Sequence, residues 1–88
     1  MSQLELDIHS YLTKSFLFTA DLTALKRDAS LLEQGILDST GVLELVSFLE
    51  QHFGITVSDD ELLPENLDSV EKIALFVENK KHVDAHAA

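Results

Sequence analysis

Ser39 is the side chain whose position in this sequence best suits covalent chemistry. A serine hydroxyl can act as a nucleophile or carry a phosphate group, and Ser39 follows Asp38 at the predicted start of a helix. The free N–H groups and the dipole of a helix N-terminus favour an attached phosphate. An Asp-Ser pair also serves as an ordinary helix cap, because short polar side chains bond the first backbone N–H groups. From these two residues alone, Ser39 could either carry a covalent group or cap the helix.

Nucleophilic catalysis by Ser39 would require a base within hydrogen-bond reach. His52 lies on the same predicted helix, about 20 Å further along at 1.5 Å per residue. His9 belongs to a different predicted helix, and no pattern brings it to Ser39. The chain also lacks a glycine-rich phosphate loop. We therefore expect a protein that is not an enzyme, and a minimal serine hydrolase is disfavoured.

Metal binding is not expected from this sequence. The chain has no cysteine, which excludes a thiolate zinc site and a disulfide framework. His82 and His86 are four residues apart with Asp84 between them, a spacing found in metal sites. They fall in the segment 82–88, which we expect to be a disordered tail.

The charge of the chain is strongly negative and unevenly distributed. The formal net charge is -10, and no lysine or arginine occurs in residues 28–71, here called the acidic segment. Its field repels nucleic acid and anionic membranes and attracts basic protein surfaces, although a merely solubilising role is the alternative. No apolar stretch reaches the roughly 18 residues of a membrane span, and the N-terminus has no basic signal-peptide region. We expect a cytoplasmic location, no nucleic-acid binding and no membrane insertion.

The apolar spacing predicts an all-α fold in one domain. Apolar residues recur at three and four positions in 3–18, 39–53 and 68–81, which predicts three main helices. Asp68 or Ser69 would cap the last of them, and residues 59–63 form one short helical turn closed by Pro64. A long first loop, 20–38, should be held to the core by four apolar side chains: Leu31, Leu32, Ile36 and Leu37. The expectation is a small four-helix bundle over residues 1–81.

The helix predicted at 39–53 has one buried and one exposed face, and Gly54 should end it. At 100° per residue the buried stripe consists of Val42, Leu45, Val46, Leu49 and Phe53. Leu43 falls on the opposite side, beside Ser39, Ser47 and Glu50. An exposed leucine next to Ser39 on an acidic face is a candidate contact for a partner protein.

Several segments together resemble the acyl carrier proteins. The first is Asp38-Ser39 followed by Glu44-Leu45, the pattern D-S-x-x-x-x-E-L. Residues 29–33, 53–60 and 67–74 are similar to the family in the same order. The resemblance covers most of the chain.

The resemblance implies a carrier role for Ser39. In that family a phosphopantetheinyl transferase attaches 4'-phosphopantetheine covalently to the serine, and the arm's thiol holds an acyl or aminoacyl group as a thioester. Asp38, which precedes this serine, would take part in its recognition by the transferase. Further partners implied are an acyl- or aminoacyl-activating ligase and a downstream acyltransferase or synthase, with a monomeric carrier between them. Recognition would involve five residues of the predicted helix: Thr40, Leu43, Glu44, Ser47 and Glu50.

Two residues next to Ser39 depart from the commonest pattern. Thr40 occupies a position where most members have leucine or methionine, and Gly41 one where fatty-acid members usually have an acid. The run Gly-Ile-Leu-Asp-Ser is closer to D-alanyl carrier proteins and to freestanding carriers loaded by adenylate-forming ligases. We expect a freestanding carrier in a specialised pathway, with a D-alanyl or aminoacyl carrier as the alternative. An acidic interaction module, in which Ser39 only caps a helix, is the alternative of another class.

Overall fold

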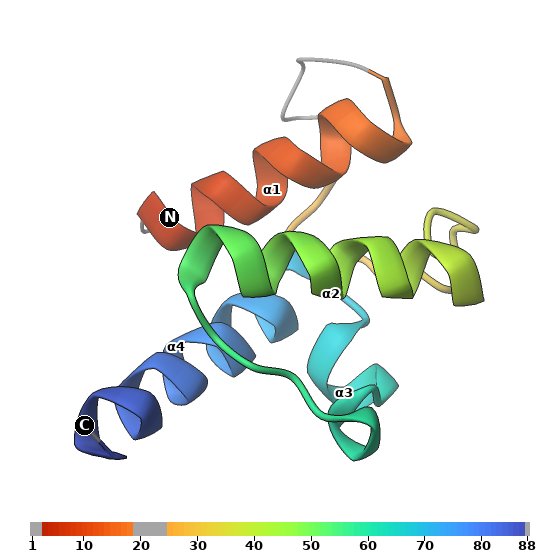
Figure 1. Cartoon of the computed structure of the whole chain (residues 1–88). Helices are drawn as coiled ribbons and strands as arrows, with labels where there is room; N and C mark the ends of the chain where they lie inside the picture. Colours follow the sequence, from red (N-terminus) through yellow and green to blue (C-terminus); the bar gives the residue numbers. More distant parts are fainter. Residues whose placement is uncertain (1–2, 19–24, 88) are drawn as a thin grey trace.

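The computed structural model describes residues 3–18 and 25–87, with side chains up to residue 81, and within these ranges it contains helices and no strand. The helices are α1 (Gln3–Phe16), α2 (Ser39–Phe53), α3 (Pro64–Leu67) and α4 (Val70–Ala87), and a short 3-10 helix, η2 (Asp59–Glu61), precedes α3. Figure 1 shows α2 crossing in front of α4, with α1 above it. The predicted four-helix bundle of three main helices, one short helix and a long first loop is confirmed.

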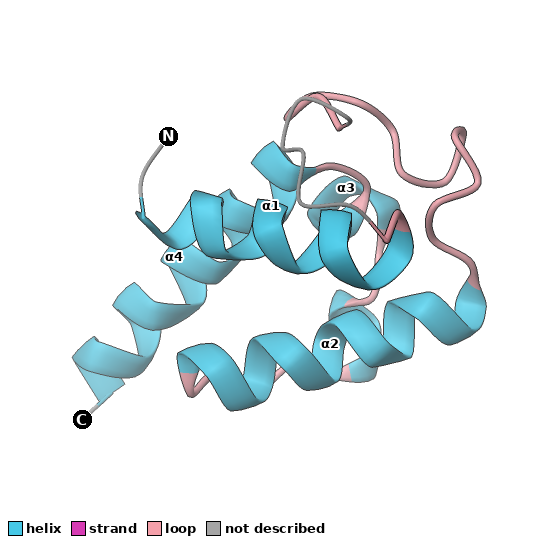
Figure 2. Cartoon of the chain, turned by 90° about the horizontal axis from the view of Figure 1, so that it is seen from above, coloured by secondary structure: helices cyan, strands magenta, loops and turns pink. Residues whose placement is uncertain are grey.

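The start of α2 lies at the end of the molecule where the long loop and α3 meet. In Figure 1 the beginning of α1 and the end of α4 lie on the left, whereas the first turn of α2 and α3 lie on the right. Seen from above, the loop that precedes α2 curves around this end before entering the helix (Figure 2). The first turn of α2, which begins with Ser39, therefore lies at the same end of the molecule as the long loop and α3.

The bounds predicted for α2 are confirmed at both ends. Asp38 precedes the helix, and its Oδ1 accepts a hydrogen bond of 2.7 Å from the Gly41 backbone N–H. Gly54 follows the helix with φ of 69°, a left-handed conformation that glycine adopts without steric cost. Its N–H donates to the Glu50 carbonyl at 3.0 Å, which satisfies a carbonyl left free at the helix end.

The core forms where the three long helices face one another. It contains fully buried side chains from each of them, among them Ile8, Leu12, Leu45, Leu49, Ile73 and Val77. The long loop contributes Leu31 and Leu37, as predicted. Leu32 was expected beside them but is 43% exposed, so that prediction is wrong. Its backbone N–H is bonded to Asp68, as described below, and its side chain lies at the rim of a pocket instead of in the core.

The region around Pro64 differs from the sequence prediction. Residues 59–63 were expected to form one turn closed by proline, but only Asp59–Glu61 are helical and Pro64 opens α3. Proline suits the first turn of a helix because its φ is already helical and its missing N–H would have had no partner there. The sequence alone could not decide between these two uses of proline.

The last helix begins as predicted and runs further than expected. Ser69 Oγ accepts a hydrogen bond from the Lys72 N–H at 3.0 Å, so of the two candidate caps Ser69 performs this role. The helix continues to Ala87, whereas we expected its end at about Lys81. The side chains of 82–87, including both histidines of the predicted tail, lie outside the described residues. The division into a domain of residues 1–81 and a disordered tail stays a prediction.

The inner face of α1 contains polar side chains that hold the end of the long loop. Glu5 is 4% exposed and accepts a hydrogen bond from Arg27 Nε at 2.8 Å. His9 is also buried, and its Nε2 lies 2.7 Å from the Leu25 carbonyl oxygen, to which it donates. These contacts, which the apolar pattern did not predict, attach residues 25–27 to α1.

Candidate functional site

The Asp-Ser pair at the start of α2 divides its roles between the two residues. Asp38 is the cap, as its bond to Gly41 demonstrates, and Ser39 is the first residue of the helix. The Ser39 side chain is exposed, and within the described part of the chain its hydroxyl has no hydrogen-bond partner. The hydroxyl is thus free to carry a substituent at the N-terminus of the helix. This geometry fits an attached phosphodiester, whose negative charge the helix N-terminus stabilises.

A side chain at Gly41 would be crowded. A Cβ added there would lie 3.1 Å from Phe16 Cε1 and 3.3 Å from both Asp38 Oδ1 and Leu37 Cδ2. Phe16 ends α1, and the Asp38 oxygen is held by its capping bond. A side chain such as the acid that fatty-acid carriers usually have at this position would require Phe16, Leu37 or the capping carboxylate of Asp38 to shift by a few tenths of an ångström, which gives the departure at Gly41 a physical reason.

Neither of the two described histidines that might have acted as a base for Ser39 is bonded to it. His9 is buried against Leu25, at the opposite side of α1 from solvent. His52 lies in the last turn of α2, where it stacks on Phe48 and its Nε2 lies 3.2 Å from Asp7 Oδ2. The bonds from Gln3 and His52 lower the pKa of Asp7 below its usual value. Among the described residues no group of histidine and acidic side chains is arranged to hold a metal ion.

The outer face of α2 presents most of the predicted recognition residues to solvent. Leu43 is 62% exposed, which confirms the expected orientation of this leucine. Thr40, Glu44 and Ser47 are exposed as well. Glu50 differs from them, because its Oε2 accepts a hydrogen bond from the Val57 N–H at 2.9 Å and holds the segment after α2.

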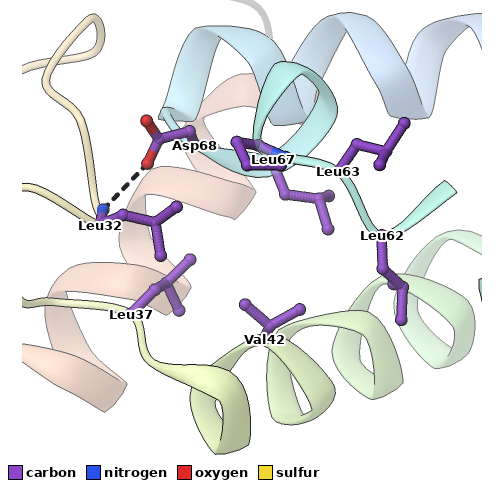
Figure 3. Close-up of a pocket in the computed structure, with 8 residues that line it drawn as sticks. Leu32, Leu37, Val42, Leu62, Leu63, Leu67 and Asp68 are labelled. Atoms are coloured by element: carbon purple, nitrogen blue, oxygen red, sulfur yellow. Dashed lines mark hydrogen bonds between the residues drawn. The ribbon is translucent and has the colours of Figure 1, made fainter.

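An apolar pocket that the sequence did not predict lies beside the start of α2. Its lining consists of Leu32 and Leu37 from the loop, Val42 from α2, and Leu62, Leu63, Pro64, Leu67 and Asp68 around α3. In Figure 3 the side chains of Leu32, Leu37 and Leu67 extend toward a common space, with Val42 below it. The cavity has a volume of about 130 Å³ and opens to solvent. Leu37 and Val42 flank Ser39 in sequence, so the pocket adjoins the candidate site.

The sequence signal for this pocket was weak. Leu32 and Leu63 are 43% and 41% exposed, which is unremarkable for two isolated leucines. They form a rim only because the fold brings residues 31–37 next to 62–68. The only indication in the sequence was that each segment contains two consecutive leucines, Leu31-Leu32 and Leu62-Leu63.

Comparison with known proteins decides the family. Residues 18–77 match the family model described as the phosphopantetheine attachment site. The chain belongs to this family. It is 43% identical over 53 residues to an acyl carrier protein homolog of Mycoplasmopsis pulmonis, a match that covers 60% of this chain and 70% of that protein. It is also 37% identical over 70 residues to a D-alanyl carrier protein of Streptococcus mutans, covering 77% and 87% respectively.

A solved structure supports the same assignment. The holo acyl carrier protein of Nitrosomonas europaea, determined in solution by NMR, superposes with a TM-score of 0.74 at 29% identity. The match covers 93% of this chain and 99% of that protein. The family resemblance expected from the sequence and the covalent 4'-phosphopantetheine that it implies are thereby confirmed.

Membership carries some general properties of carrier proteins with it. Proteins of this family interact with a phosphopantetheinyl transferase and with the enzymes of their pathway, and they are generally not catalytic. None of the helices described for this chain is long and apolar enough to cross a membrane. Cytoplasmic location and a monomeric state stay predictions.

Proposed function

We propose that Ser39 is the residue to which 4'-phosphopantetheine is attached. The observation that carries the proposal is the exposed, unbonded Ser39 hydroxyl in the first turn of α2, next to a cap provided entirely by Asp38. When bound, the group supplies a thiol that forms a thioester with an acyl or aminoacyl cargo. The chain itself has no cysteine to supply one. In this proposal the protein holds the cargo and presents it to other enzymes, without catalysis of its own.

The apolar pocket supports an acyl cargo over an aminoacyl one. Its lining is apolar except for Asp68, so it would desolvate the ammonium group of an aminoacyl cargo at a large cost. A cavity of about 150 Å³ is known to hold benzene, so the 130 Å³ here would accept an apolar group of roughly six carbon atoms. We infer a short apolar acyl chain. In the alternative, a D-alanyl or other aminoacyl group would remain outside the pocket.

The outer face of α2 is the proposed docking surface. Thr40, Leu43, Glu44 and Ser47 are exposed around the first three turns, within the acidic segment. An exposed leucine among acidic residues suits enzymes that present a basic rim around an apolar contact. The proposed partners are the transferase, an acyl- or aminoacyl-activating ligase, and a downstream acyltransferase or synthase. Glu50 would contribute mainly by holding Val57 in place.

Modification of the purified protein tests the attachment residue. Incubation with coenzyme A and a broad-specificity transferase should add the mass of one phosphopantetheine group. Ser39→Ala should abolish the addition, whereas Ser15→Ala, which removes an exposed serine of α1 outside the proposed docking surface, should leave it unchanged. Intact mass spectrometry measures both. A wild-type protein that several transferases leave unmodified would refute the proposal, as would modification that persists in Ser39→Ala.

A further inference from the structure

Asp68, at the junction of α3 and α4, makes three hydrogen bonds to the long loop, here called the Asp68 bridge. Its Oδ2 accepts from Ser30 Oγ at 2.6 Å, and its Oδ1 accepts from the Leu32 N–H at 2.9 Å. Its main-chain carbonyl accepts from the Leu31 N–H at 2.8 Å. Carboxylate acceptors of this kind form stronger hydrogen bonds than neutral groups do. One residue thus holds three consecutive positions of the loop.

The Asp68 bridge joins the two walls of the apolar pocket. Leu32 and Leu37 form the loop wall, and Leu62, Leu63 and Leu67 form the opposite wall next to Asp68 itself. Figure 3 shows the bond from the Leu32 backbone to Asp68 at one side of the cavity. Among the hydrogen bonds of the described residues, only those of the bridge connect residues 30–37 with residues 61–68.

The bridge also contributes to the position of Leu37, although no described hydrogen bond joins Leu37 to Asp68 directly. The Leu31 carbonyl accepts hydrogen bonds from the Ile36 and Leu37 N–H groups at 2.9 and 3.2 Å. Leu31 is fully buried and is bonded through its own N–H to Asp68. A displacement of the bridge would therefore move both leucines of the loop wall together.

We propose that Asp68 sets the width of the pocket and thereby the length of acyl chain that the protein shields. The inference rests on the proposed function, because it requires cargo carried from Ser39 to enter the pocket. Asp68 is a positioning residue in this account and does not contact the thioester. Without its carboxylate, the loop wall keeps only the bond from the Leu31 N–H to the Asp68 main-chain carbonyl, so its distance from α3 is less closely fixed and the cavity no longer matches one chain length.

Chain-length dependence of thioester protection tests the proposal. A transferase loads the full chain directly from acyl-coenzyme A thioesters of increasing length, and the rate of thioester cleavage by hydroxylamine is then measured. In the wild type the rate should fall as the chain approaches the pocket's capacity. Asp68→Ala removes two hydrogen bonds to the carboxylate, so the protection of the best-shielded chain should drop by more than about five-fold, the effect of about one net hydrogen bond. The acetyl thioester, too short to fill the pocket, should react equally in both proteins.

Matched variants show whether a loss of thioester protection is specific to the Asp68 bridge or follows from removing any acidic residue nearby. Glu65→Ala removes an exposed acid from α3 without a described hydrogen bond and should reproduce the wild-type profile. Ser30→Ala removes only the Ser30 contact and should give an intermediate loss of protection, which keeps the test available if Asp68→Ala folds poorly. Hydrogen exchange in the unmodified protein gives a readout that needs no cargo. The Leu32 amide, whose acceptor is the lost carboxylate, should exchange faster in Asp68→Ala than in Glu65→Ala.

The outcomes distinguish this inference from the proposed function. If all variants accept phosphopantetheine and remain folded but share one chain-length profile, the inference is overturned and the carrier role stands. A wild-type protein without any chain-length dependence overturns it as well. If the wild type is not modified at all, the proposed function fails. Whatever the result of loading, unchanged exchange of the Leu32 amide in Asp68→Ala would show that the Asp68 carboxylate does not determine the loop position.

Discussion

At the scale of single residues, the site consists of neighbours with separate physical tasks. Asp38 satisfies the helix N-terminus, Ser39 remains available, and Gly41 gives both of them room by having no side chain. From the sequence, capping and attachment could not be assigned to one residue or the other, since Asp and Ser are both good caps. The hydrogen bond from the Gly41 N–H to Asp38 Oδ1 assigns the capping role to Asp38.

The first residue-scale prediction concerns Asp38 and Ser39. Asp38→Ala should lower the free energy of unfolding by about 1 kcal/mol, because it removes the cap of α2. Ser39→Ala should leave it almost unchanged, since the hydroxyl makes no described hydrogen bond. Urea denaturation followed by circular dichroism measures both variants. Equal losses in the two variants would mean that Ser39 shares the capping role and is less free than the structure indicates.

The second concerns Gly41. Gly41→Asp introduces the acid common among fatty-acid carriers and should destabilise the protein by about 1–3 kcal/mol, the usual cost of inserting atoms into a packed site. Thr40→Asp adds the same charge at the preceding, exposed position and should cost far less. The comparison matters because helix propensity alone favours replacing glycine. If the two variants are equally stable, crowding by Phe16 does not determine the residue at position 41.

At the scale of elements, the chain shows which local patterns the sequence determines and which need tertiary contacts. The bounds of α2 followed from Asp38, the apolar stripe and Gly54, all of which are local signals. The buried Glu5 and His9 on α1 were not predicted, because their partners Arg27 and Leu25 come from a loop without periodicity. The pocket was missed for the same reason, since among the hydrogen bonds of the described residues only the Asp68 bridge joins its two walls. Predicting it would require knowing that residues 31–37 lie beside 62–68.

An element-scale prediction concerns the contact between η2 and α4. Glu61 accepts hydrogen bonds from the Ser58 N–H and from Lys80 Nζ, both at 3.0 Å, and these bonds lower the pKa of its carboxyl. A carboxyl with a lowered pKa in the folded state stabilises the protein above its unfolded pKa of about 4.3. This contribution is lost as the pH falls through the lower, folded value. The wild type should therefore exceed Glu61→Gln in stability at pH 7 and lose that advantage in acid.

Urea unfolding of both proteins at several pH values between 7 and 3 measures this difference. Asp60→Gln changes an adjacent exposed acid without a described side-chain hydrogen bond and serves as the control. It should show little pH-dependent difference from the wild type. A stability gap between wild type and Glu61→Gln that stays constant down to pH 3 would contradict the role assigned to ionised Glu61.

At the scale of the whole molecule, the negative charge of the acidic segment lies in the same part of the structure as the candidate site. The acidic segment includes α2, η2 and α3, so the negative field surrounds Ser39 and the mouth of the pocket. The basic residues belong to α1, to the start of the described loop and to α4. A partner with a basic surface is therefore drawn toward the end of the molecule where the candidate attachment residue lies. The sequence predicted this separation of charge, although not that the pocket opens within it.

The corresponding prediction is a position-dependent effect of charge on modification by the transferase. Glu44→Gln removes an exposed charge beside Leu43 on the proposed docking face, and it should lower kcat/KM mainly through slower association. Glu78→Gln removes the same charge from the exposed surface of α4, outside the acidic segment, and should have a smaller effect. Both differences should shrink as the salt concentration rises, because the Debye length falls from about 10 Å at 0.1 M to about 3 Å at 1 M. Equal effects of the two substitutions at every salt concentration would indicate that only net charge matters and that partners do not dock on α2.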